Sequence, residues 1–309
     1  MSVDPTFAGL ISELHFYDTS SYRAFCVDDE SSKLMKLNHI YVDATGDDEG
    51  VDDDYEYLEP HDAPHLLQTS SLSLCSSIAP LQEYNSFHLL EVVELSLVDL
   101  SGSALSSLSQ HNAPILKHIK LDYIETPDTS NGISRLSRSS LDKLTMHNCD
   151  SGVLQLFNDA LLASLHNLVL MSSSNLTEAH VKTAFLAANQ LESLFIGDST
   201  TTKIIEVMEW TRASGPSSQI LPSLRSLGLK VRRDKKSPPR QPDLEATHVG
   251  ILQEILSPRT GSPRSEPLRR AQSGTCISFQ LETLRMSKVL VGPHRAWYAE
   301  RVKSFKLLR

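Results

Sequence analysis

The chain has 309 residues, of which 40% are hydrophobic and 6% aromatic, and its formal net charge is −9. The negative charge argues against a general nucleic-acid binder, and the lack of any apolar run of about 18 residues argues against a membrane span. The cysteines Cys26, Cys75, Cys149 and Cys276 show no paired spacing, which argues against a disulfide framework or a zinc site and favours a cytoplasmic or nuclear protein.

A repeated triplet of apolar residues organises the chain. In Leu141, Leu144 and Met146 the apolar side chains follow the spacing 0, +3, +5. Ten segments keep this spacing, one of them a degenerate copy with Thr69 at its first position, and they begin at residues 11, 37, 69, 92, 116, 141, 165, 191, 224 and 281. Most intervals are 23 to 26 residues, and those of 32, 33 and 57 residues indicate insertions into otherwise regular units.

Each triplet predicts a short strand, because side chains two residues apart along a strand lie on one face of a sheet. The residue between the last two apolar positions then points to the opposite face. In chain order these residues are His15, Tyr41, Ser73, Ser96, Lys120, Thr145, Val169, Phe195, Gly228 and Arg285.

Helical periodicity follows several of these strands. Apolar faces at helical spacing occur in residues 104–108, 153–161, 181–188 and 204–208. One strand and one helix per turn predict an α/β fold, namely an open, horseshoe-shaped solenoid with a parallel sheet on its concave side and helices on its convex side. Residues 1–309 then form a single domain, with repeats from about 7 to 290.

The first insertion is acidic. Residues 46–62 contain nine Asp or Glu residues and no Lys or Arg. Three interpretations remain open: a solvated loop, an acidic patch that attracts a basic partner, or a calcium loop with Gly50 at its sixth position. The calcium loop has the least support, because Thr45 stands where such a loop needs Asp at its first position.

The second insertion, residues 230–275, is basic and rich in Pro and Ser. This composition predicts disorder around a helix-like island at 244–256. The Lys and Arg cluster at 230–236 is interpreted either as a nuclear import signal or as part of a solvated loop. Ser-Pro steps in the insertion are acceptable phosphorylation sites, and phosphate there would oppose the basic charge.

Both ends of an open solenoid need a cap, because the apolar layer is otherwise exposed there. Residues 293–309 predict a closing C-terminal helix, with Pro293 near its start and Trp297, Val302 and Phe305 as apolar residues. Residues 1–6 are too few to cap the first layer. We therefore expect a preceding segment or another subunit to cover the N-terminal end.

No catalytic, cofactor-binding or metal-ligating constellation occurs in the sequence. The motifs H-E-x-x-H, G-x-S-x-G, G-x-x-x-x-G-K-[ST] and G-x-G-x-x-G are absent. Cys149 is interpreted as a buried structural residue of its repeat. An enzyme would therefore need a site that only the fold assembles.

The ten triplets resemble the leucine-rich repeat family. The period of 24 to 26 residues, and a Cys or Ser/Thr such as Cys149 three residues after the last apolar position, are similar to the cysteine-containing class found in F-box proteins. The loose, serine-rich repeats resemble fungal F-box proteins in particular. In that family the repeats hold the substrate of a cullin–RING ubiquitin ligase and the F-box holds the adaptor, but no F-box is visible here.

The concave face of such a solenoid is the expected surface for a protein partner. Val169 and Phe195 fall on neighbouring turns with Met171 beside them, and an apolar group on a polar sheet face indicates a partner site. The alternative is that a loop or the tail covers this group. The other candidate residues on this face are Tyr41, Lys120, Asp122, Lys143, Thr145, His147 and Arg285.

The sequence therefore predicts a non-catalytic protein-interaction module that binds no cofactor, nucleic acid or membrane. The resemblance implies substrate recognition in an F-box-type ubiquitin ligase. A stand-alone leucine-rich repeat scaffold unrelated to ubiquitination is the alternative, and an enzyme with a site not visible in the sequence has the least support.

Overall fold

The computed structural model describes residues 12–18, 20–21, 38–45, 69–76, 87–97, 108–124, 136, 138, 140–172, 176–211, 220–232, 242–257 and 281–308. The acidic insertion at 46–62, residues 104–107 of the first expected helix, and residues 233–241 and 258–280 lie outside the described residues. Predictions made for those segments stay predictions.

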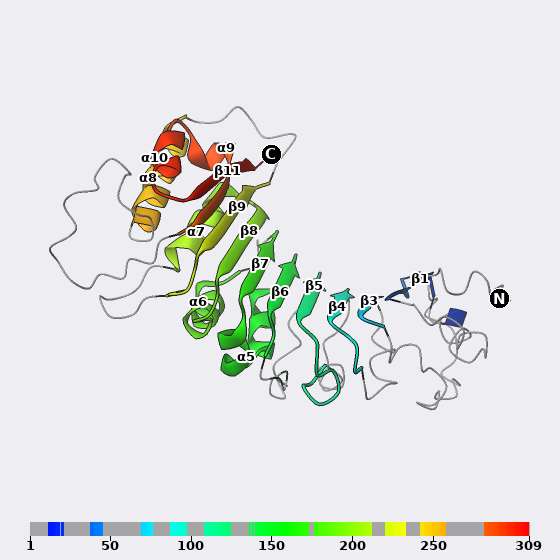
Figure 1. The fold of residues 1–309 in the computed structure, drawn as a ribbon. Coiled ribbons are helices and arrows are strands. Elements are labelled where there is room, and N and C mark those ends of the chain that lie inside the picture. Colours follow the sequence, from blue (N-terminus) through cyan, green and yellow to red (C-terminus); the bar gives the residue numbers. More distant parts are fainter. Residues whose placement is uncertain are drawn as a thin grey trace. The chain divides into compact units, whose positions relative to one another are not determined.

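Eleven strands form one open parallel sheet and follow one another in chain order (Figure 1). The predicted α/β class and open parallel sheet are therefore confirmed. The chain divides into two compact units, an N-terminal unit of residues 1–144 and 155–161 and a C-terminal unit of residues 145–154 and 162–309. The strands are β1 Glu13–Phe16, β2 His39–Asp43, β3 Ser71–Cys75, β4 Val92–Ser96, β5 His118–Asp122, β6 Lys143–His147, β7 Asn167–Met171, β8 Ser193–Ser199, β9 Ser226–Val231, β10 Thr283–Ser287 and β11 Ser304–Leu308.

Aliphatic side chains on one face of the strands fill the core of the N-terminal unit. Ile40 of β2 lies opposite Leu72 of β3, and Val42 lies opposite Leu74. These four side chains are 0–1% exposed. Since burial of one such side chain stabilises a fold by about 1.5–3 kcal/mol, the repeated pairs explain why the 0, +3, +5 triplet recurs.

The fourth repeat begins at Leu90, not at Val92 as predicted. Its buried pair is Val93 and Leu95, both 0% exposed, whereas Leu97 is 52% exposed. Both registers place apolar residues at 0, +3 and +5, so the sequence pattern alone does not separate them.

Strand pairing separates the two registers. Val93 lies opposite Leu72 of β3, and Glu94 lies opposite Ser73. Glu94 therefore occupies the position between the two buried residues, and the prediction of Ser96 for that position is wrong. A slip of two residues leaves the same side of the strand facing the core, which is why alternation did not reveal it.

Five successive strands, β3 to β7, are each followed by a residue with a left-handed backbone. In the N-terminal unit, Leu97 and Tyr123 have φ of 53° and 52°. The amide of Leu97 donates to the carbonyl of Asp122 on the next strand at 3.0 Å, so the bend links consecutive turns. A non-glycine residue in this conformation costs about 1–2 kcal/mol, which the inter-turn bond and the core offset. In the C-terminal unit this conformation also occurs at Asn148 and Asp198, whose short polar side chains tolerate it better.

A buried arginine fixes the loop between β4 and β5 in the N-terminal unit. Arg138 is 3% exposed. Its guanidinium donates to the carbonyls of Leu108 at 3.0 Å, Ala113 at 2.6 Å and Leu116 at 2.8 Å. Burial lowers the pKa of Arg138 to about 10, so the group stays charged at neutral pH. The carbonyl dipoles thus take the place of water around this cation.

Helices cover the aliphatic face of the C-terminal unit. α7 packs on β8 and β9, and α9 packs on β9 and β10 (Figure 1). The helices predicted in 181–188, 204–208 and 244–256 are confirmed. Within the described residues, no helix is both long enough and apolar enough to cross a membrane. The helical elements are η4 Ser151–Leu156, α5 Asp159–Ser164, α6 Glu178–Ala187, α7 Thr201–Glu209, α8 Pro242–Leu256, α9 Lys288–Val291 and α10 Arg295–Ala299.

The helix predicted over 153–161 is divided into two. Residues 151–156 form the 3-10 helix η4, and α5 begins at Asp159. The division lies at Asn158, whose side-chain oxygen accepts the amide of Leu161 at 2.8 Å. A side chain that accepts an amide three residues later starts a new helix, so Asn158 caps α5.

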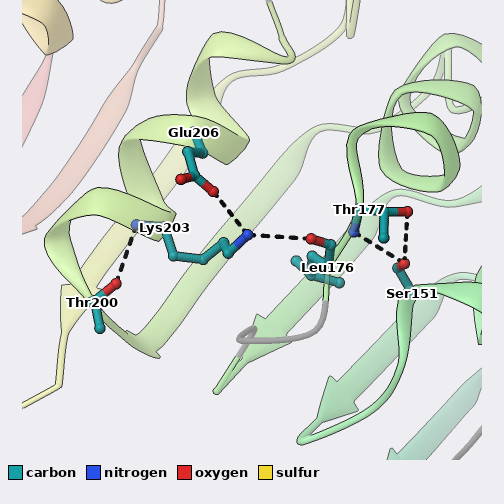
Figure 2. A network of polar contacts seen from close by, with 6 residues as sticks. All are labelled: Ser151, Leu176, Thr177, Thr200, Lys203 and Glu206. Carbon is teal, nitrogen blue, oxygen red and sulfur yellow. Dashed lines mark hydrogen bonds and ion pairs between the residues drawn. The ribbon is translucent and has the colours of Figure 1, made fainter.

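Polar contacts hold successive helical turns of the C-terminal unit together (Figure 2). Lys203 of α7 donates to the carbonyl of Leu176 at 3.2 Å and pairs with Glu206 at 2.8 Å. The hydroxyl of Thr200 accepts the amide of Lys203 at 3.2 Å and caps α7. The lysine therefore connects α7 to the segment that precedes α6.

The C-terminal segment forms a strand where a helix is predicted. In place of one helix over 293–309, the short helix α10 ends at Ala299 and β11 follows. Phe305 lies opposite Leu284, and Leu307 lies opposite Met286. The prediction of a helix is therefore wrong beyond residue 299.

The physical reason is an eleventh copy of the repeat. Val302, Phe305 and Leu307 keep the 0, +3, +5 spacing, and Val302 is 3% exposed. The first two apolar residues, three apart, also fit a helix, so the two patterns compete. Pairing with β10 satisfies a row of backbone groups that a helix would leave open on that strand, and this favours the strand.

Candidate partner-binding face

The open face is the sheet face opposite the buried aliphatic side chains. In the N-terminal unit its central row contains polar and aromatic side chains that lie opposite one another on successive strands. Lys120 and Glu94 form an ion pair at 3.0 Å in this row, and about two fifths of each side chain is exposed. The row contains His15, Tyr41, Ser73, Glu94 and Lys120.

Two other predicted residues of the N-terminal unit, Tyr41 and Asp122, lie on this face. The hydroxyl of Tyr41 donates to Asp43 at 3.3 Å, and its ring lies 5.3 Å from that of His15. Desolvation first, and the Asp43 carboxylate second, raise the pKa of Tyr41, so the phenol stays neutral. Asp122 lies at the end of β5 beside Ser96. Tyr41, like Lys120, therefore already contacts polar neighbours on this face.

One histidine on this face is strongly perturbed. Burial first, and then the cations Lys143 and Lys120, lower the pKa of His118 to about 4, against smaller opposing effects of Glu94 and Asp142. His118 is therefore neutral at neutral pH. Lys143, a predicted site residue on β6, thus acts on the N-terminal face through its charge.

The central row of the C-terminal unit is apolar at one end and cationic at the other. Val169 lies opposite Phe195, which lies opposite Gly228. Gly228 lies opposite Arg285, and Arg285 lies opposite Lys306. The structure therefore brings the predicted residues Val169, Phe195 and Arg285 into one row, and Lys306 extends it.

Two glycines form a floor for the aromatic ring of Phe195. A Cβ placed on Gly228 or on Gly197 would overlap the ring, and one on Gly197 would also lie 2.6 Å from Sδ of Met171. The ring therefore lies against both glycines, over β8 and β9, and Met171 lies beside it over β8. Val169, Met171 and Phe195 are all half-buried. An aromatic ring over a cross-strand glycine shields backbone that glycine leaves bare.

The predicted residues of β6 that belong to the C-terminal unit are Thr145 and His147. A ring nitrogen of His147 lies 3.4 Å from the hydroxyl of Ser172, and another contact of 3.3 Å joins the ring to the side-chain amide of Asn148. Both partners have left-handed backbones at strand ends. His147 therefore supports the turns at the end of β6 and β7.

Two features of this face were not predicted as parts of the site: the glycines Gly197 and Gly228 beneath Phe195, and the cation Lys306 on β11. Gly228 stands at the correct register position, but a glycine there gives no signal until the neighbouring aromatic residue is aligned with it. Lys306 was missed because its strand was taken for a helix. The 0, +3, +5 spacing at Val302 is the signal that identifies it.

A second Ser–His contact joins the hydroxyl of Ser151 to Nδ1 of His180 at 3.1 Å. Ser151 is 0% exposed, and its oxygen also accepts the amide of Thr177 at 3.1 Å. The hydroxyl is buried and makes three contacts, two with Thr177 (Figure 2) and one with His180, so it links successive turns of the repeat. Among the described residues, no group of three His, Cys, Asp or Glu side chains is placed to hold a metal ion.

Comparison with known proteins gives no relative for this chain. No family model, no curated protein and no solved structure matched it. The repeat character therefore rests on the spacing of the chain's own apolar residues and on the parallel strand register that they produce.

Proposed function

We propose that the protein is a non-catalytic interaction module of the leucine-rich repeat type, and that the open face around Phe195 binds a protein partner. One observation supports the proposal most directly. Val169, Met171 and Phe195 form an apolar group on the sheet face opposite the core. These side chains do not fill the core, so packing of the core does not explain why they are apolar. Partly exposed aromatic side chains in a flat apolar group are typical centres of protein interfaces.

The surroundings of Phe195 suit an interface. The glycine floor holds the ring in one orientation, which reduces the conformational entropy that binding would otherwise cost. The group is also supported by regular strands, and rigid elements position a binding residue better than loops do. The N-terminal face, where Lys120 and Glu94 already pair, has less to offer an apolar anchor.

The family resemblance suggests a narrower role. The chain is similar to the repeat region of fungal-type F-box proteins, in which the repeats hold the substrate of a ubiquitin ligase. A stand-alone scaffold in the cytoplasm or nucleus is the alternative, and the buried free thiols of Cys75 and Cys149 are compatible with either compartment. Co-purification of a cullin and the F-box adaptor with the chain favours the ligase; a captured partner without them favours the scaffold.

The test is partner capture from a lysate of the source cells with tagged 1–309 and with three variants. Phe195→Asp places a charge in the apolar group, Phe195→Leu keeps an apolar side chain, and His15→Asp places the same charge on the open face of the N-terminal unit. We expect Phe195→Asp to lose the partner, Phe195→Leu to retain part of it, and His15→Asp to retain it. Thermal unfolding of each variant separates lost binding from lost folding. Full capture by a folded Phe195→Asp variant would refute the proposal.

A further inference from the structure

The open face of the C-terminal unit has an uneven distribution of charge. Beside the central row lies a row of uncharged polar side chains. Its members are Asn167, Ser193, Ser226, Thr283 and Ser304. The central row adds two cations, Arg285 and Lys306, both exposed. Neither row contains an acidic residue.

The third row adds one ion pair. Lys230 of β9 lies 3.4 Å from Asp198 of β8, and about a third of each side chain is exposed. The carboxylate of Asp198 is therefore balanced by its own neighbour. The two remaining cations, Arg285 and Lys306, give the face a positive end. The C-terminal unit as a whole is also positively charged. It contains 21 Lys or Arg and 13 Asp or Glu residues, a net charge of +8.

The spacing along the central row defines what fits it. Phe195 and Arg285 are two strands apart, with Gly228 between them. Neighbouring strands lie about 4.8 Å apart, so the apolar group and Arg285 are separated by roughly 10 Å. Gly228 has no side chain of its own, and the ring of Phe195 fills the space that a Cβ there would take, so no other side chain of the central row stands between Phe195 and Arg285.

We propose that the occupant of this face is an extended, acidic segment of a partner protein that carries one aromatic or aliphatic anchor. The anchor contacts Val169, Met171 and Phe195, and carboxylates about three residues further along pair with Arg285 and Lys306. An extended chain advances about 3.3–3.6 Å per residue, so three residues span the gap. This inference rests on the proposed function and specifies the partner class for the same face.

Charge complementarity is the physical basis of this choice. An acidic segment gains from two exposed cations that have no acidic neighbour within their rows, and long-range attraction raises its rate of association. A basic segment with the same anchor is repelled by those cations. Surface charges of this kind decide which partner is selected more than how tightly it binds, so the preference for acidic sequences is the measurable consequence.

The experiment is a selection of random displayed peptides, twelve residues long, on purified 1–309. The proposal predicts enrichment of net acidic peptides with one aromatic or aliphatic residue and acidic residues three to four positions away. A selected peptide is then titrated by fluorescence anisotropy against the unaltered chain and three variants. Phe195→Ser and the double variant Arg285→Glu/Lys306→Glu are each expected to weaken binding at least tenfold, and Arg295→Glu, an exposed cation on α10, less than twofold.

The outcomes separate this inference from the proposed function. Enrichment of basic or uncharged peptides that still require Phe195 overturns the acidic class and leaves the binding face intact. Peptides whose binding survives Phe195→Ser overturn both. Absence of any enriched peptide overturns the linear acidic segment, and the capture experiment with Phe195→Asp then decides the proposed function by itself. Circular dichroism of each variant verifies that the fold is retained.

Discussion

The two units repeat the same strand geometry but differ in charge and in the chemistry of their open faces. The N-terminal unit contains 25 Asp or Glu and 8 Lys or Arg residues, a net charge of −17, whereas the C-terminal unit has a net charge of +8. On the N-terminal face Lys120 pairs with Glu94. On the C-terminal face Phe195 lies on Gly228, with Arg285 beyond it.

This difference shows which part of the repeat is free to vary. The 0, +3, +5 residues are fixed by the core in both units, because the buried pairs occupy the same register positions. The residues between them make no core contact, so each unit carries a different surface on the same scaffold. A partner site in such a protein is therefore found by comparing the intervening residues of successive strands, not the repeat itself.

The two units also differ in what covers the aliphatic face of their strands. In the N-terminal unit the described loop 108–116 is held by the guanidinium of Arg138. In the C-terminal unit α7 and α9 pack on the strands through buried residues such as Ile204 and Leu290. One unit thus depends locally on a polar clamp, and the other on aliphatic packing.

The largest expected effect comes from breaking that clamp. Arg138→Met leaves three carbonyls without their donor in a buried place, and we expect it to lower the free energy of unfolding by about 3–5 kcal/mol. Urea denaturation followed by circular dichroism measures the change. Hydrogen exchange should show that the loss of protection begins in residues 108–124, and the C-terminal unit should keep its protection.

Arg295→Met is the matched control, because Arg295 is exposed on α10. This substitution should change the free energy of unfolding by no more than about 0.5 kcal/mol. A loss below about 1 kcal/mol for Arg138→Met would contradict the role of the clamp. Equal loss of protection in both units would instead show that the units unfold together.

A smaller effect is expected at the glycine floor of the C-terminal unit. In Gly228→Ala the new Cβ overlaps the ring of Phe195, so the ring must leave the sheet. We expect a loss of about 1–2 kcal/mol in stability from the displaced contacts, together with a change in the accessibility of the ring. Thermal denaturation and the NMR signals of Phe195 measure the two effects.

Gly250→Ala is the control for this change. Gly250 lies in α8, and a Cβ placed there meets nothing within 4 Å. Alanine in a helix is better than glycine by roughly 0.5–1 kcal/mol, so this variant should become more stable. If both variants shift stability in the same direction, the close approach of Phe195 to Gly228 is not what makes glycine necessary.

The sequence predicted the class of fold because the apolar triplets alone dictate parallel strands with one buried face. It did not predict the register of β4, since Leu90 and Val92 both start an acceptable triplet and only pairing with β3 separates them. It did not predict β11, because Val302 and Phe305 also fit a helix. Arg138 lies outside the repeat pattern, and no local signal in the sequence marks a guanidinium that binds carbonyls about 22 to 30 residues earlier.

The candidate site was predicted in part for the same reason. Alternation identifies which residues face away from the core, and Val169, Phe195 and Arg285 occupy such positions in the structure. Alternation assigns a side chain to one face of the sheet, but it does not predict how the side chain lies across that face. The position of the Phe195 ring depends on glycines of its own strand and of the next strand, a tertiary feature that one strand does not encode.

The smallest of the expected effects concerns His118 on the N-terminal face. Burial, with help from Lys143 and Lys120, lowers the pKa of His118 to about 4 from its ordinary value of 6.5. The unfolded chain therefore binds the proton more readily than the folded chain between these values. Stability from this group is fully present above about pH 6.5 and is lost as the pH falls toward 4.

The size of the effect is reduced because His118 is only half-buried. After allowance for solvent screening, we expect a loss of about 1 kcal/mol between pH 6.5 and 4. His118→Gln keeps a polar side chain without a titrating ring and should flatten the dependence of unfolding free energy on pH in this window. The Thr45 amide lowers the pKa of the Asp43 carboxylate. Such carboxylates lose their contribution to the free energy of unfolding only below about pH 4, so their effect is separate from that of His118. If the variant and the unaltered chain have the same slope between pH 6.5 and 4, the pH dependence comes from another group, and burial on the N-terminal face is weaker than its contacts indicate.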